Sequence, residues 1–485
     1  MADGIPQSDA STNPAPPASG GTATLPFVGR FDSADGLSFG LTSLLALVVY
    51  LFTLGPGVSL EFSGELSTAA FYAGVAHPAG YPLWTIYSWL LTTLLPCSNI
   101  AWRVGVGSAI AAALACGTVA LMVSSGAKLL MVDSPHFERL TSQERKWARM
   151  VCGYVAGMAL GMSGAVWRKA VIADIWALSL LLFVLILCLG FRWMMQPEKK
   201  RFLFSQYLLM GLLLTNSQEM IVMLPGLVFI AFMGNRELSR DLALTVLAVA
   251  AILSRWSQFG LWCDFPELGN LPLLGAFAAV TAFGLLLALR TRGFGSTWRS
   301  VCLCNVCLFL GFAFCLYLPI ASMTNPPANW GYPRTIGGFT HVLSRGQYER
   351  LVPTADLGRF AEQLWMLIRM AGEDLGWLYL LFATVPFMCL RRMNQEARSW
   401  VFALVVIFVC VGPLLVAEIN PMTDLQGQDL SKFYFTPLFA TLSVLSGLGM
   451  TLSIPLLGRR APKMPGERPV APFQPSTPDL SSSAL

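Results

Sequence analysis

Two glutamates and a histidine stand close together near the start of the chain, in a polar segment between apolar runs. Glu61 and Glu65 are four residues apart, so a helix through them would place both carboxylates on one face. Carboxylates beside apolar surface can have a raised pKa and act as general bases, although two solvated loop acids would show the same spacing. His77 lies in the turn His-Pro-Ala-Gly-Tyr-Pro, whose prolines and glycine restrict the backbone. It could orient a substrate or its phosphate, or make a structural hydrogen bond.

A third acid stands alone inside an apolar run. Asp174 lies within residues 170–178, and Arg168 and Lys169 come shortly before it. A charge kept at the edge of a membrane segment belongs to a functional site more often than to the scaffold. We therefore expect Asp174 to contribute to the chemistry, although a structural role is the alternative.

A long loop, residues 322–372, alternates aromatic, amide and guanidinium side chains. Such side chains suit a pocket that stacks a sugar ring and binds a phosphate, although a packed loop with surface arginines has the same composition. A lysine before the last apolar run adds another cation. The candidate binding residues are His77, Tyr81, Asn325, Asn329, Trp330, Arg334, Arg345, Tyr348 and Lys432.

The elements that must position these residues are membrane helices. The chain has 485 residues, of which 55% are hydrophobic and only 12% charged, with a mean hydropathy of +0.61. Its apolar runs are repeatedly long enough to cross about 30 Å of hydrocarbon. We therefore expect an all-α polytopic helix bundle. The expected spans are residues 38–55, 104–132, 150–166, 175–194, 202–215, 220–234, 241–257, 271–289, 300–321, 375–390, 399–417 and 433–456.

One apolar piece, residues 83–95, is too short to cross, since about 13 residues cover only about 20 Å. We expect a partial or surface-lying helix there. With about twelve spans and both termini inside, every cluster of Lys and Arg then falls on the cytoplasmic side, as the positive-inside rule requires. The same topology places residues 56–82, 168–174, 322–372 and 418–432 on one outer face.

The remaining composition excludes several classes of protein. Most of the 11 cysteines lie in apolar runs without disulfide or zinc spacing, and packing explains them. The absence of a Walker motif, a dinucleotide loop and HExxH argues against ATP-driven transport and zinc proteolysis. Nothing indicates nucleic-acid binding, because the basic residues lie in short cytoplasmic loops whose topological role explains them.

Four parts of the chain resemble a known family, the transmembrane protein 260 type of membrane glycosyltransferase and its bacterial relatives in the GT-C superfamily. The similar strings are Ser63-Gly-Glu-Leu66 with Gly74-Val-Ala-His-Pro-Ala-Gly-Tyr-Pro-Leu83; residues 170–178; Tyr317-Leu-Pro-Ile320 with Asn325-Pro-Pro-Ala-Asn-Trp-Gly331 and Arg345-Gly-Gln-Tyr348; and Lys432-Phe-Tyr-Phe-Thr-Pro437. They extend over nearly the whole membrane region. The resemblance implies a GT-C-like catalytic domain over residues 37–457. The composition of residues 1–36 and of the basic segment 458–485, both rich in Pro and Ser, predicts a disordered tail on each side of it.

The resemblance also implies an activity. Such enzymes transfer a sugar from a polyprenyl- or dolichyl-phosphate donor to an acceptor hydroxyl on the non-cytoplasmic side, and the eukaryotic members are protein O-mannosyltransferases. They use an acid of the first outer loop as catalytic base, in the pattern Asp-Ser-Gly-Glu. Here Phe62 occupies the Asp position. Glu61 or Glu65 could replace that acid, the acid could serve a binding role met differently here, or activity could be lost.

We therefore expect an inverting transferase that moves mannose or another hexose to a protein Ser/Thr or a glycan. Glu61 or Glu65 is the expected base, Asp174 orients the acceptor or the sugar, and cations bind the phosphate. The scheme needs no cofactor and no metal, although two outer carboxylates could hold one. A transporter or lipid-linked-saccharide flippase is the alternative, but no internal repeat supports it. The compact length and short loops favour a bacterial plasma membrane over the endoplasmic reticulum.

Overall fold

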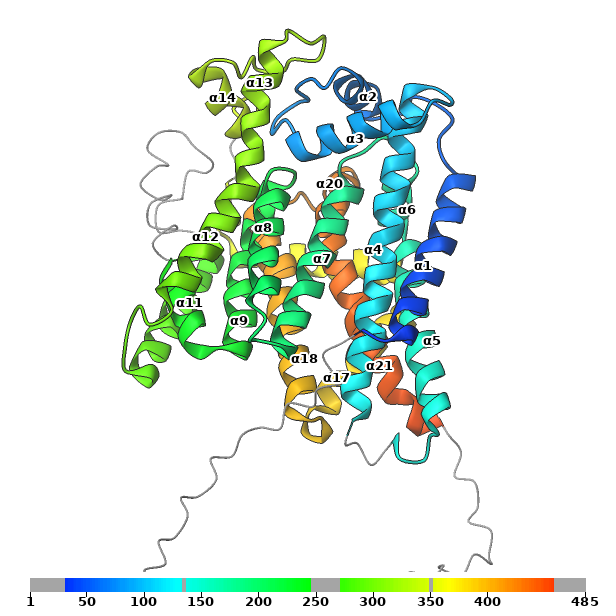
Figure 1. Cartoon of the computed structure of the whole chain (residues 1–485), viewed down its shortest axis with the longest axis vertical. Helices are drawn as coiled ribbons and strands as arrows, with labels where there is room; N and C mark the ends of the chain where they lie inside the picture. The colour runs from blue at the N-terminus through cyan, green and yellow to red at the C-terminus, as the bar shows by residue number, and fades with distance from the viewer. Residues whose placement is uncertain (1–30, 133–136, 246–270, 349–351, 458–485) are drawn as a thin grey trace, which may run out of the picture.

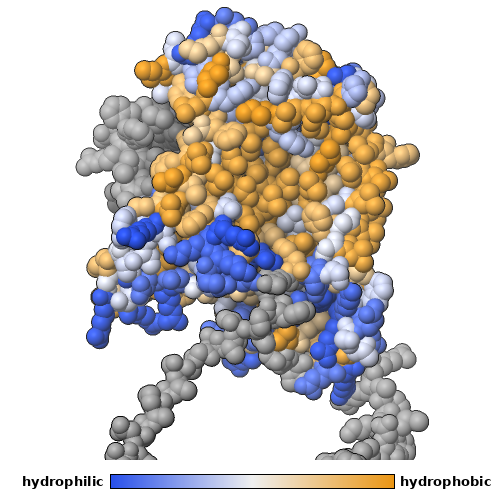
Figure 2. All heavy atoms as spheres, in the orientation of Figure 1, coloured by the Kyte–Doolittle hydropathy of each residue, from blue (hydrophilic) through white to orange (hydrophobic). Residues whose placement is uncertain are grey.

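The computed structural model describes residues 31–132, 137–245, 271–348 and 352–457, and these form a bundle of helices (Figure 1). Within these ranges the only β structure is an isolated bridge between Val75 and Asn329. Apolar side chains form a broad band around the middle of the visible face, and strongly hydrophilic residues gather at one end (Figure 2). The expected all-α polytopic membrane bundle is confirmed. The predicted tails, residues 1–36 and 458–485, lie outside the described residues apart from residues 31–36.

The long helices run between the two ends of the bundle. Among the described residues, six helices are long and apolar enough to span a membrane, or seven if the bent pair of α5 and α6 counts as one span. Shorter apolar helices add further segments, so the total of twelve stays a prediction. The span expected at residues 241–257 passes beyond the described residues after residue 245. The main helices are α1 (Ser33–Phe52), α4 (Ile100–Met131), α5 (Ser142–Gly161), α7 (Trp176–Met195), α8 (Lys200–Leu214), α9 (Leu224–Gly234), α11 (Leu271–Thr291), α12 (Trp298–Phe312), α16 (Trp377–Phe382), α17 (Val385–Met388), α18 (Gln395–Val409), α19 (Leu415–Ile419) and α21 (Thr436–Leu457).

Small residues bring the central helices together. α4 is rich in Ala, Gly and Ser and contacts α1, α5 and α7. On α5, Gly153 and Gly157 are four residues apart, and a Cβ on either would lie 2.5 Å from a carbonyl oxygen of α4, that of Ala120 or Cys116. Glycines at this spacing allow two membrane helices to approach at backbone distance.

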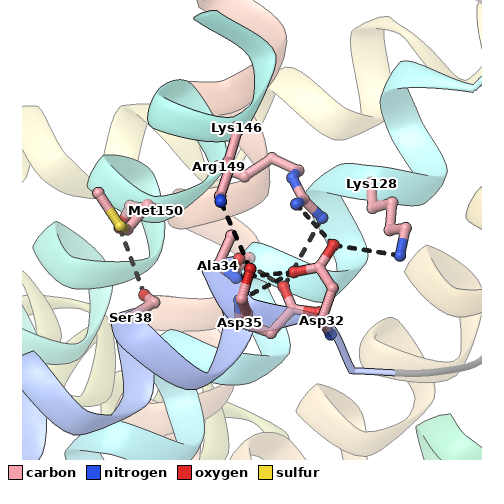
Figure 3. Close-up of polar contacts among 10 residues, drawn as sticks. Asp32, Ala34, Asp35, Ser38, Lys128, Lys146, Arg149 and Met150 are labelled. Atoms are coloured by element: carbon pink, nitrogen blue, oxygen red, sulfur yellow. Dashed lines mark hydrogen bonds and ion pairs between the residues drawn. The ribbon is translucent and has the colours of Figure 1, made fainter. Parts of the chain in front are cut away.

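Ion pairs join the helices at the end of the bundle where α1 begins (Figure 3). We call this the inner end and the opposite one the outer end, after the predicted topology. Asp32 caps α1 together with Asp35, so the helix starts at Ser33, four residues before the boundary expected from composition. Arg149 of α5 lies 2.9 Å from Asp32 and 3.7 Å from the fully buried Asp35. Lys128 of α4 lies 3.3 Å from Asp32. Three helices are thus joined by one ionic cluster.

The outer end carries the polar segments. Short helices α2 (Ser63–Phe71) and α3 (Pro82–Leu94) lie across it near α14 (Ile336–Leu343) (Figure 1). The apolar piece expected to be too short for a span thus forms the 13-residue helix α3. Long-range contacts join the four segments assigned to this face. They include the bridge of Val75 with Asn329, Arg168 with Asp429 at 3.8 Å, and Thr354 with Asn420 at 3.1 Å. Lys432 also forms an ion pair with Asp374, two residues beyond the long loop.

Candidate active site

Glu65 supports the turn that contains His77. The helix α2 begins at Ser63, whereas Glu61 has a left-handed φ of +67° and stands outside it. The two glutamates therefore do not share a helix face. One carboxylate oxygen of Glu65 accepts the backbone N–H of His77 at 2.8 Å, and the other lies 2.6 Å from its Nδ1. The hydroxyl of Tyr81 lies 3.2 Å from Nε2, and the ring of Phe62 stands 4.5 Å from the imidazole.

Glu61 and Asp174 meet at a common cation. Lys169 lies in the short helix α6 (Gly164–Ala170) and is only 4% exposed. Its Nζ donates to Asp174 at 2.9 Å and also to Glu61. The same ammonium lies 4.1 Å from the ring centre of Phe433, just before α21. Glu61 remains 44% exposed at its side chain, so this carboxylate is open to solvent while Asp174 is not.

The chain fixes Asp174 from several sides. Its side chain accepts the backbone N–H of Trp176 at 3.0 Å, at the start of α7. Its carbonyl oxygen accepts the indole N–H of Trp84 at 2.9 Å and the hydroxyl of Ser108 at 3.2 Å. Burial raises the pKa of Asp174 above its usual value, while the ammonium of Lys169 opposes that shift. The residue is therefore rigid and sensitive to the charge on the lysine.

A small pocket, partly open to the outside, lies beside this group at the outer end of the bundle; we call it the cavity. It lies between the turn that follows His77, the start of α7, the turn η2 (Gln218–Met223) before α9, and the loop after α14. Arg345 has a left-handed φ of +53°, and its guanidinium hydrogen-bonds the hydroxyl of Tyr434. The lining residues are Ala79, Tyr81, Ile175, Trp176, Asn216, Gln218, Glu219, Arg345 and Tyr434. Ile175 and Tyr434 directly follow Asp174 and Phe433 in the chain, so the cavity adjoins the site of Lys169.

The other predicted cations have partners elsewhere. Arg334 is exposed, donates to the side chain of Asn325 at 2.6 Å and lies over the ring of Tyr332. Lys432 pairs with Asp374, whose second oxygen accepts the backbone N–H of Ala165 at 2.8 Å. Of the three cations predicted to bind a phosphate, the structure places Arg345 in the cavity.

The predicted aromatic and amide residues of the long loop have mixed positions. The backbone N–H of Trp330 donates to the carbonyl of Val75 at 3.2 Å, and its side chain is 43% exposed. The amide of Asn329 donates to the carbonyl of Ser322 at 3.4 Å. Tyr348 is half-exposed, and the guanidinium of Arg345 lies 5.3 Å from its ring centre. These residues hold the loop against the segment before α3.

Sequence reasoning missed several residues of the site. Glu219 is a lone acid at the head of an apolar run, which is the same signal that identified Asp174. Tyr434 lies within the similar string at residues 432–437 but was not singled out, and Asn216 gave no signal beyond a polar group near a span. Lys169 was noticed only as a neighbour of Asp174. In the part of the chain that the structure describes, no three His, Cys, Asp or Glu side chains are grouped as a metal site would need.

Comparison with known proteins agrees with the resemblance seen in the sequence. Residues 63–240 match the model of the Protein O-mannosyl-transferase TMEM260 N-terminal domain. Protein O-mannosyl-transferase TMEM260 of Mus musculus is 40% identical over 125 residues, which are 24% of this chain and 18% of that protein. The corresponding protein of Dictyostelium discoideum is 24% identical over 145 residues, 30% of this chain and 15% of that protein. The matches thus span less than a fifth of these relatives, and since both are eukaryotic they give the expected bacterial location no support.

Among solved structures, ArnT from Cupriavidus metallidurans bound to undecaprenyl phosphate aligns with a TM-score of 0.45 at 13% identity, covering 85% of this chain and 59% of that one. The apo state of the same protein aligns with a TM-score of 0.43 at 13% identity, covering 86% and 60%. The family match confirms the expected resemblance to the TMEM260 type for residues 63–240, the segment that carries Glu65, His77, Lys169, Asp174 and Glu219.

Proposed function

We propose that this multi-pass membrane protein is a glycosyltransferase that moves a hexose from a polyprenyl-phosphate donor to an acceptor hydroxyl at the outer end of the bundle. The observation that carries the proposal is the cavity lined by Arg345 beside the buried group of Lys169 and Asp174. It offers one fixed cation for a phosphate and carboxylates for a hydroxyl. The names of the two TMEM260 relatives favour mannose as the sugar and a protein as the acceptor.

Glu61 is the proposed general base. Both oxygens of Glu65 are occupied by His77, and Asp174 is buried against Lys169, whereas Glu61 is open to an acceptor. In the reaction, the acceptor oxygen attacks the anomeric carbon from the face opposite the phosphate and loses its proton to Glu61. The bond from the anomeric carbon to the phosphate oxygen breaks, and its electrons leave with the polyprenyl phosphate. The product therefore has the inverted configuration.

The remaining charged residues have supporting roles in this scheme. Arg345 meets the charge that develops on the leaving phosphate, and a donor fixed in advance stabilises such charge without moving. Lys169 holds Glu61 and Asp174 in place, so that Asp174 can orient the acceptor. Arg334 and Lys432 would act from the rim, because each already has a protein partner.

The test uses the full-length protein in lipid nanodiscs with polyprenyl-phosphate mannose and a Ser/Thr-rich acceptor peptide. Release of polyprenyl phosphate and mass increase of the peptide are measured together, and the anomeric configuration of the product is determined. Donor-dependent transfer with inversion supports the proposal. In proteoliposomes, movement of the lipid-linked sugar across the bilayer without its consumption would instead show a flippase and overturn it.

A further inference from the structure

Two buried oxygens in the cavity have no protein partner. Oε1 of Glu219 and Oδ1 of Asn216 make no hydrogen bond within the part of the chain that the structure describes, and their residues are 7% and 2% exposed. Buried polar atoms are nearly always paired, and an unpaired one costs about 1–3 kcal/mol. Both residues line the same cavity. The pair therefore indicates a ligand that brings hydrogen-bond donors.

The orientation of Asn216 is fixed by its other contacts. Its Nδ2 donates to the backbone carbonyl of Ile175 at 3.2 Å and to the hydroxyl of Ser179 at 2.7 Å. The carbonyl of Ile175 can only accept a hydrogen bond, so the NH₂ group of Asn216 must face it and the amide oxygen must point the other way. The hydroxyl of Ser179 also lies 2.8 Å from that of Ser217, which strengthens the support. The amide oxygen of Asn216 is therefore left as a preset acceptor.

The buried carboxylate of Glu219 argues against a ligand that is only a phosphate. Glu219 and Arg345 line one cavity, and burial raises the pKa of Glu219 while the charge of Arg345 opposes the shift. A site built for a phosphate alone would gain nothing from a carboxylate next to its cation, because the carboxylate repels the anion. The helix α19, which contacts η2, carries another acid, Glu418, whose Oε2 is buried without a hydrogen-bond partner among the described residues. It adds no positive charge. The ligand must therefore carry neutral donors in addition to any phosphate.

The cavity also has an aromatic side. The rings of Trp176 and Tyr434 pack edge to face with centroids 4.6 Å apart, and Tyr81 closes another side. A hexose has an apolar face of C–H groups and a rim of hydroxyls, so it matches a pocket of aromatic rings and a few placed acceptors.

We propose that Glu219 and Asn216 recognise the sugar of the donor, each accepting a hydrogen bond from a ring hydroxyl. Trp176 and Tyr434 pack on the apolar face of that sugar. This inference rests on the proposed transferase function and assigns the part of the cavity that recognises the hexose. Arg345 then lies toward the phosphate. Glu219 and Asn216 are binding residues in this scheme and take no part in proton transfer.

Comparing the binding of two lipids distinguishes recognition of the sugar from a structural role of the two residues. Full-length protein in nanodiscs is titrated with polyprenyl phosphate and with polyprenyl-phosphate mannose. Glu219→Gln removes a charged acceptor and keeps the side-chain shape. We expect it to weaken binding of the mannose donor about 10- to 100-fold, the range for a hydrogen bond to a charged group. It should leave binding of bare polyprenyl phosphate unchanged or tighter, because the carboxylate no longer repels the phosphate.

Asn216→Leu should likewise weaken binding of the mannose donor but not of bare polyprenyl phosphate. We expect a loss of about 3- to 10-fold, as for a neutral hydrogen bond. The matched control is Glu237→Gln, an exposed glutamate at the other end of the bundle, which should change neither affinity. Equal losses for both lipids would show a structural role, and no loss for the donor would show that water satisfies these oxygens. Either result overturns the inference. If wild-type protein binds the donor selectively but never transfers mannose, the proposed function fails while the sugar pocket stands.

Discussion

Nδ1 of His77 lies 2.6 Å from Oε2 of Glu65, and the backbone N–H of the same histidine donates to Oε1 at 2.8 Å. One carboxylate thus holds both the main chain and the ring of a residue twelve positions away. The hydroxyl of Tyr81 lies 3.2 Å from Nε2 of the same ring, and Tyr81 lines the cavity. Glu65 therefore acts through the turn, as a positioning residue.

This arrangement separates the two candidate bases. Glu61→Gln should lower kcat by about 10²- to 10⁴-fold, the usual contribution of a general base, with little change in thermal stability. Glu65→Gln should lower kcat less but reduce the melting temperature. The carboxamide has one oxygen in place of two, so it can accept only one of the two contacts that Glu65 makes with His77. Transfer of mannose and thermal unfolding of the two variants in nanodiscs give the comparison. Full activity in both variants would remove both glutamates from the mechanism.

The charge of Lys169 should determine the acidic limit of activity. Burial raises the pKa of Asp174 above 3.8, while the ammonium of Lys169 opposes that shift. If the ionised form orients the acceptor, activity falls as pH decreases through this raised pKa. Lys169→Met removes the opposing charge, so the acidic limb of the profile of kcat/KM against pH should move to higher pH. Arg168→Met is the control, since Arg168 is exposed and its contact with Asp429 is 3.8 Å long. An unmoved limb in Lys169→Met would contradict the assignment.

Arg345 should be the principal phosphate ligand among the predicted cations. A guanidinium offers paired donors that an ammonium cannot reproduce, so even Arg345→Lys should weaken binding of polyprenyl phosphate by about 10-fold or more. Arg334→Lys is the matched control in the same loop and should have a small effect, because Arg334 is exposed and bound to Asn325. Titration of both variants with the bare lipid is the measurement. Equal affinities for Arg345→Lys and wild-type protein would place the phosphate elsewhere.

The sequence predicted what depends on local properties. The apolar runs predicted the helices. Residues 83–95 were predicted to be too short to cross, and they form a helix that lies across the outer end. Charge gave the gathering of polar segments at that end. The resemblance located the segment with His77 and Asp174, although it could not say how Phe62 changes the role of its neighbours. In the structure Phe62 packs on His77, and Glu61 turns toward Lys169.

Pairings between distant residues could not be predicted from local properties. Lys169 reaches Glu61 because α5 and α6 meet at a bend of 70°, a tertiary feature. Lys432 was expected to bind a phosphate, but Asp374 lies beside it once α21 packs near α15 (Leu357–Leu375). Glu219 and Arg345 share a cavity across 126 positions of sequence. Arg345 was predicted from its loop, whereas Glu219, a lone acid beside a span, was not.

The ionic cluster at the inner end should control stability without touching the reaction (Figure 3). Although burial opposes it, the hydrogen bond and charge of Arg149 lower the pKa of Asp32 to about 2, and the same guanidinium faces Asp35. Arg149→Met leaves two carboxylates with less positive charge. Breaking such a buried pair costs about 3–5 kcal/mol, so we expect a clear fall in melting temperature with donor affinity unchanged.

The control for this prediction is Lys146→Met, because Lys146 is exposed on the same helix and only reaches Ser33 at 3.4 Å. The melting temperature of Lys146→Met should be close to that of the wild type. Adding Asp35→Asn to Arg149→Met removes the buried charge that the first substitution leaves without its cation, and the double variant should regain part of the lost stability. A depressed carboxylate pKa stabilises the fold above the unfolded value, so the contribution of Asp32 should disappear as pH falls from about 4 toward 2. Arg149→Met should flatten that part of the stability curve, and a curve identical to that of the wild type would show that the cluster contributes nothing.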